Sequence, residues 1–182
     1  MESISPFDEV EAAHQARVLE WIKSGAGLFR IRKPATPSPH LVAYFVVVDL
    51  ETRKLLLVDH KNACLWLPTG GHVERGEHPR ETVQREVREE LGIQAVFVFD
   101  YPLFVTVAET VGLTAGHTDV TLWYVLQGDS STQVTFDQEE FQSVQWFAPE
   151  EIPHERSDPN LRRFIGKLDR LLLRGDLGVF AA

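Results

Sequence analysis

Carboxylates gather in one stretch of the chain, residues 71–93, which reads GHVERGEHPRETVQREVREELGI. On a helix, Glu86, Glu89 and Glu90 fall at i, i+3 and i+4 and therefore project from one side. Like charges at this spacing repel one another, and Arg85 alone does not balance three carboxylates. Mg²⁺ takes oxygen ligands from a few carboxylates together with substrate phosphates. The stretch therefore predicts a site where a divalent metal supplies the missing positive charge together with a phosphate compound.

The residues around these carboxylates predict a loop followed by a helix. Pro79 suits the first helical turn, where its missing N–H costs nothing, and the helix dipole favours Glu81 there. Gly92 predicts the end of the helix, because glycine readily adopts the left-handed conformation that terminates many helices. The helix also has an apolar stripe, formed by Val83, Val87 and Leu91. Ahead of it, the predicted loop 68–71 contains two glycines that let the backbone approach a ligand closely.

The fixed positions of this stretch follow one spacing: Gly71, five residues, Glu77, seven residues, Arg85-Glu86-Val87, one residue, Glu89-Glu90, one residue, and Gly92-Ile93. This spacing resembles the Nudix box at every fixed position, and MutT-like flanking strands extend the resemblance over Leu41 to Trp146. The resemblance implies an α+β fold, a Nudix-type α/β/α sandwich with a mixed central sheet, to which this chain adds an N-terminal helix. It also implies a pyrophosphohydrolase that cleaves a nucleoside diphosphate linked to another moiety, with Mg²⁺ or Mn²⁺ as cofactor.

The same resemblance implies roles for individual residues. Glu86, Glu89 and Glu90 are expected to bind the metal, and the backbone carbonyl of Gly70 is expected to add a ligand. Arg85 and Glu77 are expected to form an ion pair that holds the loop against the helix, a supporting role that is common beside metal ligands.

The general base, which takes a proton from the attacking water, has several candidates. One is Glu89 or Glu86 itself. Another is Glu140, whose place six residues before Trp146 resembles an additional metal ligand of the MutT-like branch. Glu139 is its adjacent rival, and the alternative for Glu140 is a solvated loop acid without a role.

Several further residues are candidates for substrate contacts around Gly70 and Gly71. His72 could reach a phosphate, although a plain loop residue is an equal alternative. His117 borders the expected mouth of the site, and its alternative role is turn chemistry. His60 is a weaker candidate, since its setting is typical of the surface.

Aromatic and basic residues supply the remaining candidates for binding a nucleotide. Four aromatic residues lie on predicted strands, and alternation lets only some of them face the ligand: Tyr44, Phe45, Trp66 and Trp123. Trp66 could stack on a base, although most aromatics on strands belong to a core. Basic residues ahead of a proline-rich linker are candidates for phosphate contacts: Arg30, Arg32 and Lys33.

The elements along the chain divide it into an N-terminal segment, 1–39, and a Nudix hydrolase domain, 40–182. The first contains an amphipathic helix over 7–23 and a linker with three prolines over 30–40. Strands are predicted over 41–50, 55–60, 119–126 and 141–147, with one or two more over 94–107 and a short extended piece over 63–67. The segment 108–116 is predicted to be a loop, 149–152 a single helical turn and 160–173 a helix.

Composition limits the classes of partner and the compartment. A chain of 182 residues suits one domain, and its net charge of −9 argues against a surface for nucleic-acid polymers but not against a small nucleotide. Cys64 is the single cysteine, which excludes an internal disulfide. No signal peptide or apolar run of about 20 residues is present, so we expect a cytoplasmic protein that does not insert into membranes. A homodimer is compatible with the fold.

The sequence indicates the type of reaction more clearly than it indicates the substrate. The DVTLWYVL strand and the spacing from Glu140 to Trp146 favour nucleoside triphosphates, including oxidised ones. Alternatives are ADP-ribose and dinucleoside polyphosphates, although the proline and tyrosine typical of those branches are absent, as is the SQPWPFPxS pattern of NADH hydrolases. A non-catalytic nucleotide-sensing Nudix domain and a diphosphate isomerase that uses Cys64 are further alternatives.

Overall fold

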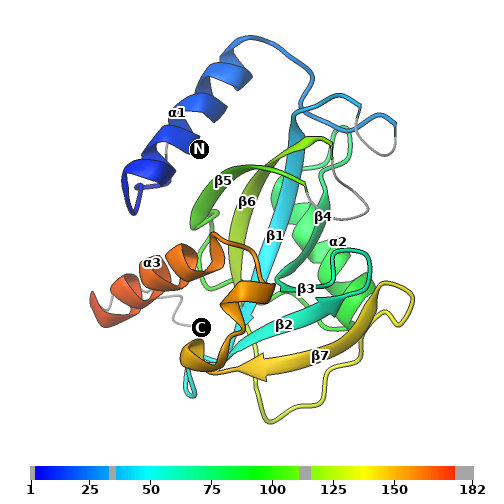
Figure 1. Cartoon of the computed structure of the whole chain (residues 1–182), viewed down its shortest axis with the longest axis vertical. Coiled ribbons are helices and arrows are strands. Elements are labelled where there is room, and N and C mark those ends of the chain that lie inside the picture. The colour runs from blue at the N-terminus through cyan, green and yellow to red at the C-terminus, as the bar shows by residue number, and fades with distance from the viewer. Residues whose placement is uncertain (1–2, 33–35, 111–115, 175–182) are drawn as a thin grey trace.

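One mixed sheet with helices on both faces forms the framework of the chain (Figure 1). The computed structural model describes residues 3–32, 36–110 and 116–174. The α-helices are α1 (Glu9–Lys23), α2 (Pro79–Leu91) and α3 (Leu161–Arg174). The strands are β1 (His40–Val48), β2 (Leu55–His60), β3 (Leu65–Leu67), β4 (Thr69–His72), β5 (Phe104–Glu109), β6 (Thr118–Gln127) and β7 (Phe141–Phe147). Two 3₁₀ turns, Pro149–Glu151 and His154–Arg156, precede α3.

The long strand β1 organises the sheet. The main order is β3-β2-β1-β6-β5, while β4 also pairs with β1 and β7 with β2. β1 runs parallel to β6 over its whole length, from His40 beside Asp119 to Val48 beside Gln127. On its other side, β1 pairs antiparallel first with β4 and then, at its end, with β2. Because β4 and the start of β6 flank the first half of β1, their side chains gather at that end of the sheet.

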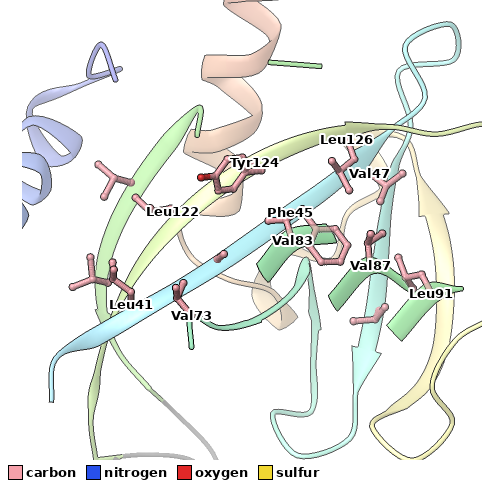
Figure 2. Packing of buried hydrophobic residues seen from close by; sticks show 14 of the residues in the cluster. Leu41, Phe45, Val47, Val73, Val83, Val87, Leu91, Leu122, Tyr124 and Leu126 are labelled. Atoms are coloured by element: carbon pink, nitrogen blue, oxygen red, sulfur yellow. The ribbon is translucent and has the colours of Figure 1, made fainter. Parts of the chain in front are cut away.

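The side chains of β1 point alternately to the two faces of the sheet, and each face has its own hydrophobic core. Ala43, Phe45 and Val47 join the core that also contains Val83, Val87 and Leu91 of α2. Figure 2 shows this packing, with the α2 stripe against Phe45 and Val47. Val46 and Val48 join the opposite core, which holds the apolar side of α3: Leu161, Phe164, Ile165 and Leu168. The expected α+β, α/β/α sandwich is therefore confirmed.

Helix α1 packs against the domain through buried and half-buried polar contacts. The N-cap residue Asp8 accepts a hydrogen bond from Nε of Arg163 on α3 at 2.8 Å. Glu11 is fully buried and accepts from Nζ of Lys167 at 2.7 Å and from the backbone N–H of Val105 at 3.3 Å. The N-terminal helix thus contacts both α3 and β5, while a domain boundary at residue 39 stays a prediction.

Strand pairing makes the structure differ from the sequence interpretation at 68–71, where the prediction was wrong, and at 94–107, where one strand is present as expected but starts late. The expected loop over 68–71 is mostly strand, because β4 pairs with β1 from Thr69 beside Phe45 to His72 beside Val42. Within 94–107 the strand begins only at Phe104, and Phe97 makes just an isolated bridge to Leu126.

Three other expectations concern the ends of elements and the linker segments. Helix α1 begins at Glu9, slightly later than expected. The expected linker over 30–40 and loop over 108–116 lie partly outside the described residues, and Lys33 lies wholly outside them. The loop prediction was wrong at Ala108 and Glu109, which belong to β5 because they pair with β6. Among the described helices, none is long and apolar enough to cross a membrane.

Candidate active site

Local signals at both ends of α2 fix the helix that carries the clustered carboxylates. The backbone N–H of Arg80 donates to Nδ1 of His78, and the backbone N–H of His78 donates to Glu81 at 2.8 Å, which completes a capping box. Gly92 ends the helix in the left-handed conformation, with φ of 66°. The apolar stripe faces the core, so the glutamates of the last two turns lie on the other sides of the helix.

Glu77 and Arg85 form the expected ion pair. Nε of Arg85 lies 3.0 Å from Oε1 of Glu77, and its Nη2 lies 3.1 Å from Oε2, so the contact is bidentate. Nη1 of the same guanidinium donates to Oε1 of Glu86 at 2.7 Å. The paired carboxylates raise the pKa of Arg85 above its ordinary value, chiefly through the hydrogen bonds that Arg85 donates to Glu77. Arg85 therefore holds the loop against α2 and orients Glu86.

An open cleft of about 800 Å³ lies beside this pair. Glu86 and Glu90 of α2 line it together with Gly70 and Gly71 of β4, and Glu140 lines it from the start of β7. Glu90 is only 5% exposed, and its Oε2 is buried without a hydrogen-bond partner in the described residues. Burial, with the nearby charges of Glu86 and Glu140, raises the pKa of Glu90 to about 9. A second negative charge beside Glu86 is therefore unfavourable at Glu90 unless a cation lies nearby.

Two glycines on β4 make room for these carboxylates. A Cβ at Gly71 would lie 1.8 Å from Oε1 of Glu86, so any side chain there would displace the carboxylate. A Cβ at Gly70 would lie 2.2 Å from the carbonyl oxygen of Ala43, and its φ of 150° is in the range that favours glycine. The strand can therefore pass close to both β1 and the end of Glu86 only because these residues lack side chains.

Two of the expected site residues lie elsewhere. The side chain of Glu89 is 61% exposed, lies 3.5 Å from Nη1 of Arg85 and is not among the residues that line the cleft. Trp66 is also outside the cleft lining, and its ring packs edge-on against Phe147 with centroids 5.0 Å apart. The aromatic side chain that lines the cleft from β1 is instead Tyr44.

Glu140, the candidate base, is paired with His60 at the end of β2. Nε2 of His60 lies 3.2 Å from Oε1 of Glu140. The backbone N–H of Asn62 donates to Nδ1 of the same ring at 3.2 Å, so Nδ1 is an acceptor and the ring proton is on Nε2. His60 therefore presents an N–H to the carboxylate of Glu140. The sequence had indicated only a surface position for His60.

His72 and His117 come together with two residues that sequence reasoning did not select, His40 and Asp119. One ligand atom from each of these four side chains lies within 4.8 Å of all the others. Burial lowers the pKa of His40 and His117, and burial raises the pKa of Asp119 to about 7. His72, His117 and Asp119 also line the cleft. The sequence signal was that His40 and His117 each stand at or next to the start of a strand. The two histidines come together only because β1 and β6 pair in parallel.

Basic residues line the cleft from the segment that precedes β1. Arg30 and Arg32 are among the lining residues, as expected for phosphate contacts. Burial lowers the pKa of Arg30, while the charges of Asp119 and Glu86 act in the opposite direction. Arg30 thus brings positive charge between the two groups of acids.

A model of the NUDIX domain matches residues 39–168, most of the chain. The chain belongs to the NUDIX family. Within this family, a 51-residue segment is 43% identical to a Bacillus subtilis (strain 168) protein named "Putative 8-oxo-dGTP diphosphatase", and it covers 28% of this chain and 34% of that protein. The chain thus spans about a third of that relative.

Two longer similarities cover most of the NUDIX domain. A "MutT-like protein" of Streptomyces ambofaciens is 28% identical over 138 residues, which cover 76% of this chain and 83% of that protein. The crystal structure of a NUDIX-family hydrolase from Clostridium perfringens superposes with a TM-score of 0.58 at 22% identity, over 74% of this chain and 99% of that one. The structural likeness confirms the NUDIX fold. The predicted membership of the Nudix hydrolase family is confirmed as well.

Divalent metals are implied for a NUDIX site, and the residues of this cleft fit such an ion. Glu90 presents a buried Oε2 without a hydrogen-bond donor among the described residues, and Gly71 leaves space that the carboxylate of Glu86 occupies. Oxygen donors of this type suit Mg²⁺ and Mn²⁺.

Proposed function

We propose that this NUDIX protein is a metal-dependent pyrophosphohydrolase that acts on nucleoside triphosphates, including oxidised ones. One observation carries the proposal: Glu86 and Glu90 enter the same cleft beside Gly70 and Gly71, while Arg85 is already paired with Glu77. Arg85 is shared between Glu77 and Glu86, and Oε2 of Glu90 has no hydrogen-bond donor in the described residues, so one guanidinium faces several carboxylates. The cleft is also large enough for a nucleotide.

The chain's own residues would hold the metal and the substrate. Glu86 and Glu90, with the carbonyl of Gly70 and with Glu89 after a change of rotamer, are the proposed ligands. When bound, a divalent metal would neutralise the diphosphate and activate water for attack on phosphorus. Arg85 orients Glu86 from its bidentate contact with Glu77. Arg30 and Arg32, which line the cleft, would bind the phosphate oxygens.

Glu140 is the proposed general base. Its carboxylate lines the cleft, and the Nε2–H of His60 faces one of its oxygens at 3.2 Å, which leaves the other oxygen for water. Glu140 would take a proton from the water as its oxygen bonds to phosphorus and the anhydride bond breaks. Glu86 and Glu89 remain alternative bases, and Glu139, which is not among the lining residues, is the weaker neighbour.

The choice of substrate rests on the relatives and on the shape of the cleft. The Bacillus subtilis relative is named for 8-oxo-dGTP and the Streptomyces ambofaciens relative is named MutT-like. Tyr44 supplies an aromatic side chain in the cleft in place of Trp66. ADP-ribose and dinucleoside polyphosphates remain the alternative substrates.

A screen of phosphate and pyrophosphate release tests this function. Nucleoside triphosphates, 8-oxo-dGTP, ADP-ribose, dinucleoside polyphosphates and NADH are offered with Mg²⁺ or Mn²⁺. We expect turnover of a triphosphate, and a loss of at least about 100-fold in kcat for Glu86→Gln and Glu90→Gln. Glu51→Gln, in the exposed turn after β1, is the matched control. Turnover within a few-fold of wild type in both cleft variants would show that the metal assignment is wrong.

The same screen separates the enzyme from a nucleotide sensor. A sensor would bind one of these nucleotides, as measured by calorimetry, and would hydrolyse none of them. A cytoplasmic location, a homodimer and the division at residue 39 stay predictions that the screen does not address.

A further inference from the structure

Three histidines and an aspartate form a compact cluster at the first half of β1, and none of these four residues belongs to α2. His40 begins β1, His72 ends β4, His117 directly precedes β6 and Asp119 is the second residue of β6. The parallel register places His40 directly beside Asp119, and the antiparallel register places His72 beside Val42, one alternation further along β1. Four chemically suitable ligands therefore converge from three neighbouring strands.

The hydrogen bonds of His40 determine which of its ring nitrogens faces the cluster. Nδ1 lies 2.6 Å from the carbonyl oxygen of Pro37, and a carbonyl can only accept, so Nδ1 carries the proton. In the neutral ring Nε2 then has a free lone pair, and this atom lies 3.2 Å from Oδ1 of Asp119. A backbone carbonyl that accepts from the outer nitrogen of a histidine is the usual support of a metal ligand.

His117, whose ring stacks on that of His40 with centroids 4.9 Å apart, has a similar arrangement. The Oγ1 of Thr110 donates to the carbonyl oxygen of His117 at 3.2 Å and lies 3.2 Å from Nδ1 of the same residue. Since the hydroxyl proton is directed to the carbonyl, Nδ1 is the donor in the second contact. Nε2 of His117 then directs its lone pair to Oδ1 of Asp119, at 3.4 Å.

In these contacts, hydrogen-bond acceptors on the histidine rings face a hydrogen-bond acceptor on Asp119 inside the protein. Nε2 of His40 and Oδ1 of Asp119 are both buried, and neither makes a hydrogen bond within the described ranges. Two lone pairs 3.2 Å apart are unfavourable unless a proton or a metal cation lies between them. The full burial of His40 excludes bulk water as the partner of its Nε2.

The spacing of the ligand atoms fits one class of cation. For metal–ligand bonds of about 2.0 Å, the edges of a tetrahedron measure about 3.3 Å. The distances from Asp119 Oδ1 to the two histidine nitrogens are 3.2 and 3.4 Å. The widest separation in the cluster stays within 4.8 Å, which a small rotation of one ring reduces to a tetrahedral edge. Three imidazoles and one carboxylate suit Zn²⁺ and related ions, whereas Mg²⁺ prefers oxygen ligands alone.

We propose that His40, His72, His117 and Asp119 form a second metal site, a closed four-ligand site for Zn²⁺ or a similar first-row divalent ion. Four protein ligands fill a tetrahedral shell, which is typical of a structural rather than a catalytic ion. The ion would tie the start of β1 and β6 to the end of β4, the strand that carries Gly70 and Gly71. The site would therefore stabilise the strand on which the hydrolytic cleft depends, and it does not depend on which substrate is hydrolysed.

Metal binding to the full chain tests the proposal without any measurement of activity. The protein is stripped with a chelator and titrated with Zn²⁺ in excess Mg²⁺, which occupies the α2 carboxylates. Calorimetry and elemental analysis should give one Zn²⁺ per chain, and Co²⁺ in its place should show the intense visible absorption of tetrahedral coordination. Absence of Zn²⁺ binding, or an octahedral Co²⁺ spectrum, would overturn the proposal.

Variants then locate the ion. Asp119→Asn and His117→Gln should lower Zn²⁺ affinity by at least about 100-fold, and Thr110→Val, which keeps all four ligands, by about 10- to 100-fold. His60→Gln, a histidine in the same cleft, and the double variant Glu86→Gln/Glu90→Gln should bind Zn²⁺ like wild type. If these two controls lose Zn²⁺ while Asp119→Asn retains it, the ion binds at the carboxylates and the proposal is wrong.

A folding control keeps the comparison valid. The thermal unfolding of each variant is measured without metal, and only variants with a cooperative transition are used for affinities. Added Zn²⁺ should raise the Tm of wild type and of His60→Gln but not that of Asp119→Asn. An equal rise in all three proteins would contradict the assignment.

Discussion

Gly71 of β4 and Glu86 of α2 touch so closely that the missing Cβ of the glycine determines where the carboxylate lies. An added Cβ would be 1.8 Å from Oε1 and 2.3 Å from Cδ of Glu86. The atoms that it meets are the far end of a flexible side chain rather than backbone. The glycine therefore affects the position of a proposed metal ligand much more than it affects the packing of the domain.

Gly71→Ala should accordingly separate activity from stability. We expect kcat to fall by about 100-fold or more, because the Glu86 carboxylate moves by an ångström or so from its place in the cleft. The free energy of unfolding should change by less than about 1 kcal/mol, because Glu86 can rotate away. Urea denaturation and steady-state kinetics on the best substrate measure the two quantities.

Gly70→Ala is the informative comparison. Its Cβ would meet the backbone oxygen of Ala43 at 2.2 Å, and β1 cannot move aside as a side chain can. This variant should lose stability as well as activity. Gly27→Ala, whose Cβ would be 3.6 Å from Pro37 Cγ, should change neither. Equal destabilisation by Gly71→Ala and Gly70→Ala would contradict the argument.

The guanidinium of Arg85 should not be replaceable by an ammonium group. Lysine cannot reproduce the bidentate contact with Glu77 and the contact with Glu86 at the same time. Arg85→Lys should therefore weaken Mg²⁺ activation by about 10- to 100-fold, as seen when the supports of metal ligands are removed. The Mg²⁺ dependence of kcat provides the measurement. Arg80 lies on the same helix but pairs with the exposed Asp100, so Arg80→Lys should leave the Mg²⁺ dependence of kcat unchanged.

The parts of the fold that could be predicted from sequence are those with local causes. Helix α2 has its capping residues, its apolar stripe and its terminal glycine within a short stretch, so its ends agree with the prediction. Strand β4 could not be predicted in this way, because Gly70 and Gly71 have low β propensity and extend only by pairing with β1.

The same distinction holds for the site. The pair of Glu77 and Arg85 was expected from the resemblance of a short stretch to the Nudix box, and the structure contains it. His40 and Asp119 had no such signal, since they become neighbours only when β1 and β6 pair in parallel across a long connection. The helical period also could not predict how exposed each glutamate is. It places Glu89 and Glu90 on the same side of α2, although Glu89 is largely exposed and Glu90 is buried.

The buried pair of Glu11 and Lys167 should contribute much more to stability than an exposed pair. Glu11 is fully buried, and Lys167 is 8% exposed, so removal of one charge leaves the other without compensation. Glu11→Gln should lower the free energy of unfolding by about 3 kcal/mol. Asp169→Asn, which removes the exposed contact with Arg53, should cost less than about 1 kcal/mol. Similar losses in the two variants, measured by urea denaturation, would show that the buried charges of Glu11 and Lys167 do not hold α1 in place.

The charge of Asp8 should make the docking of α1 depend on acid pH. Hydrogen bonds from Arg163 lower the pKa of Asp8 from 3.8 to about 2, with smaller contributions from backbone N–H groups of α1. A carboxyl group whose pKa is lower in the folded state stabilises the fold above the unfolded pKa, and this stability is lost as the pH falls through the folded pKa. The loss should therefore occur between about pH 4 and pH 2.

Asp8→Asn isolates this contribution, because asparagine can still cap α1 but carries no charge for Arg163. At pH 6 the variant should be less stable than wild type by on the order of 1 kcal/mol, a value reduced by the partial exposure of the pair. Other carboxyl groups titrate in both proteins, so the free energy of unfolding is measured against pH for wild type and variant. The difference between these two curves is the relevant quantity. That difference should shrink as the pH falls from about 4 to 2. A difference that stays constant over this range would show that the ion pair does not stabilise the docked helix.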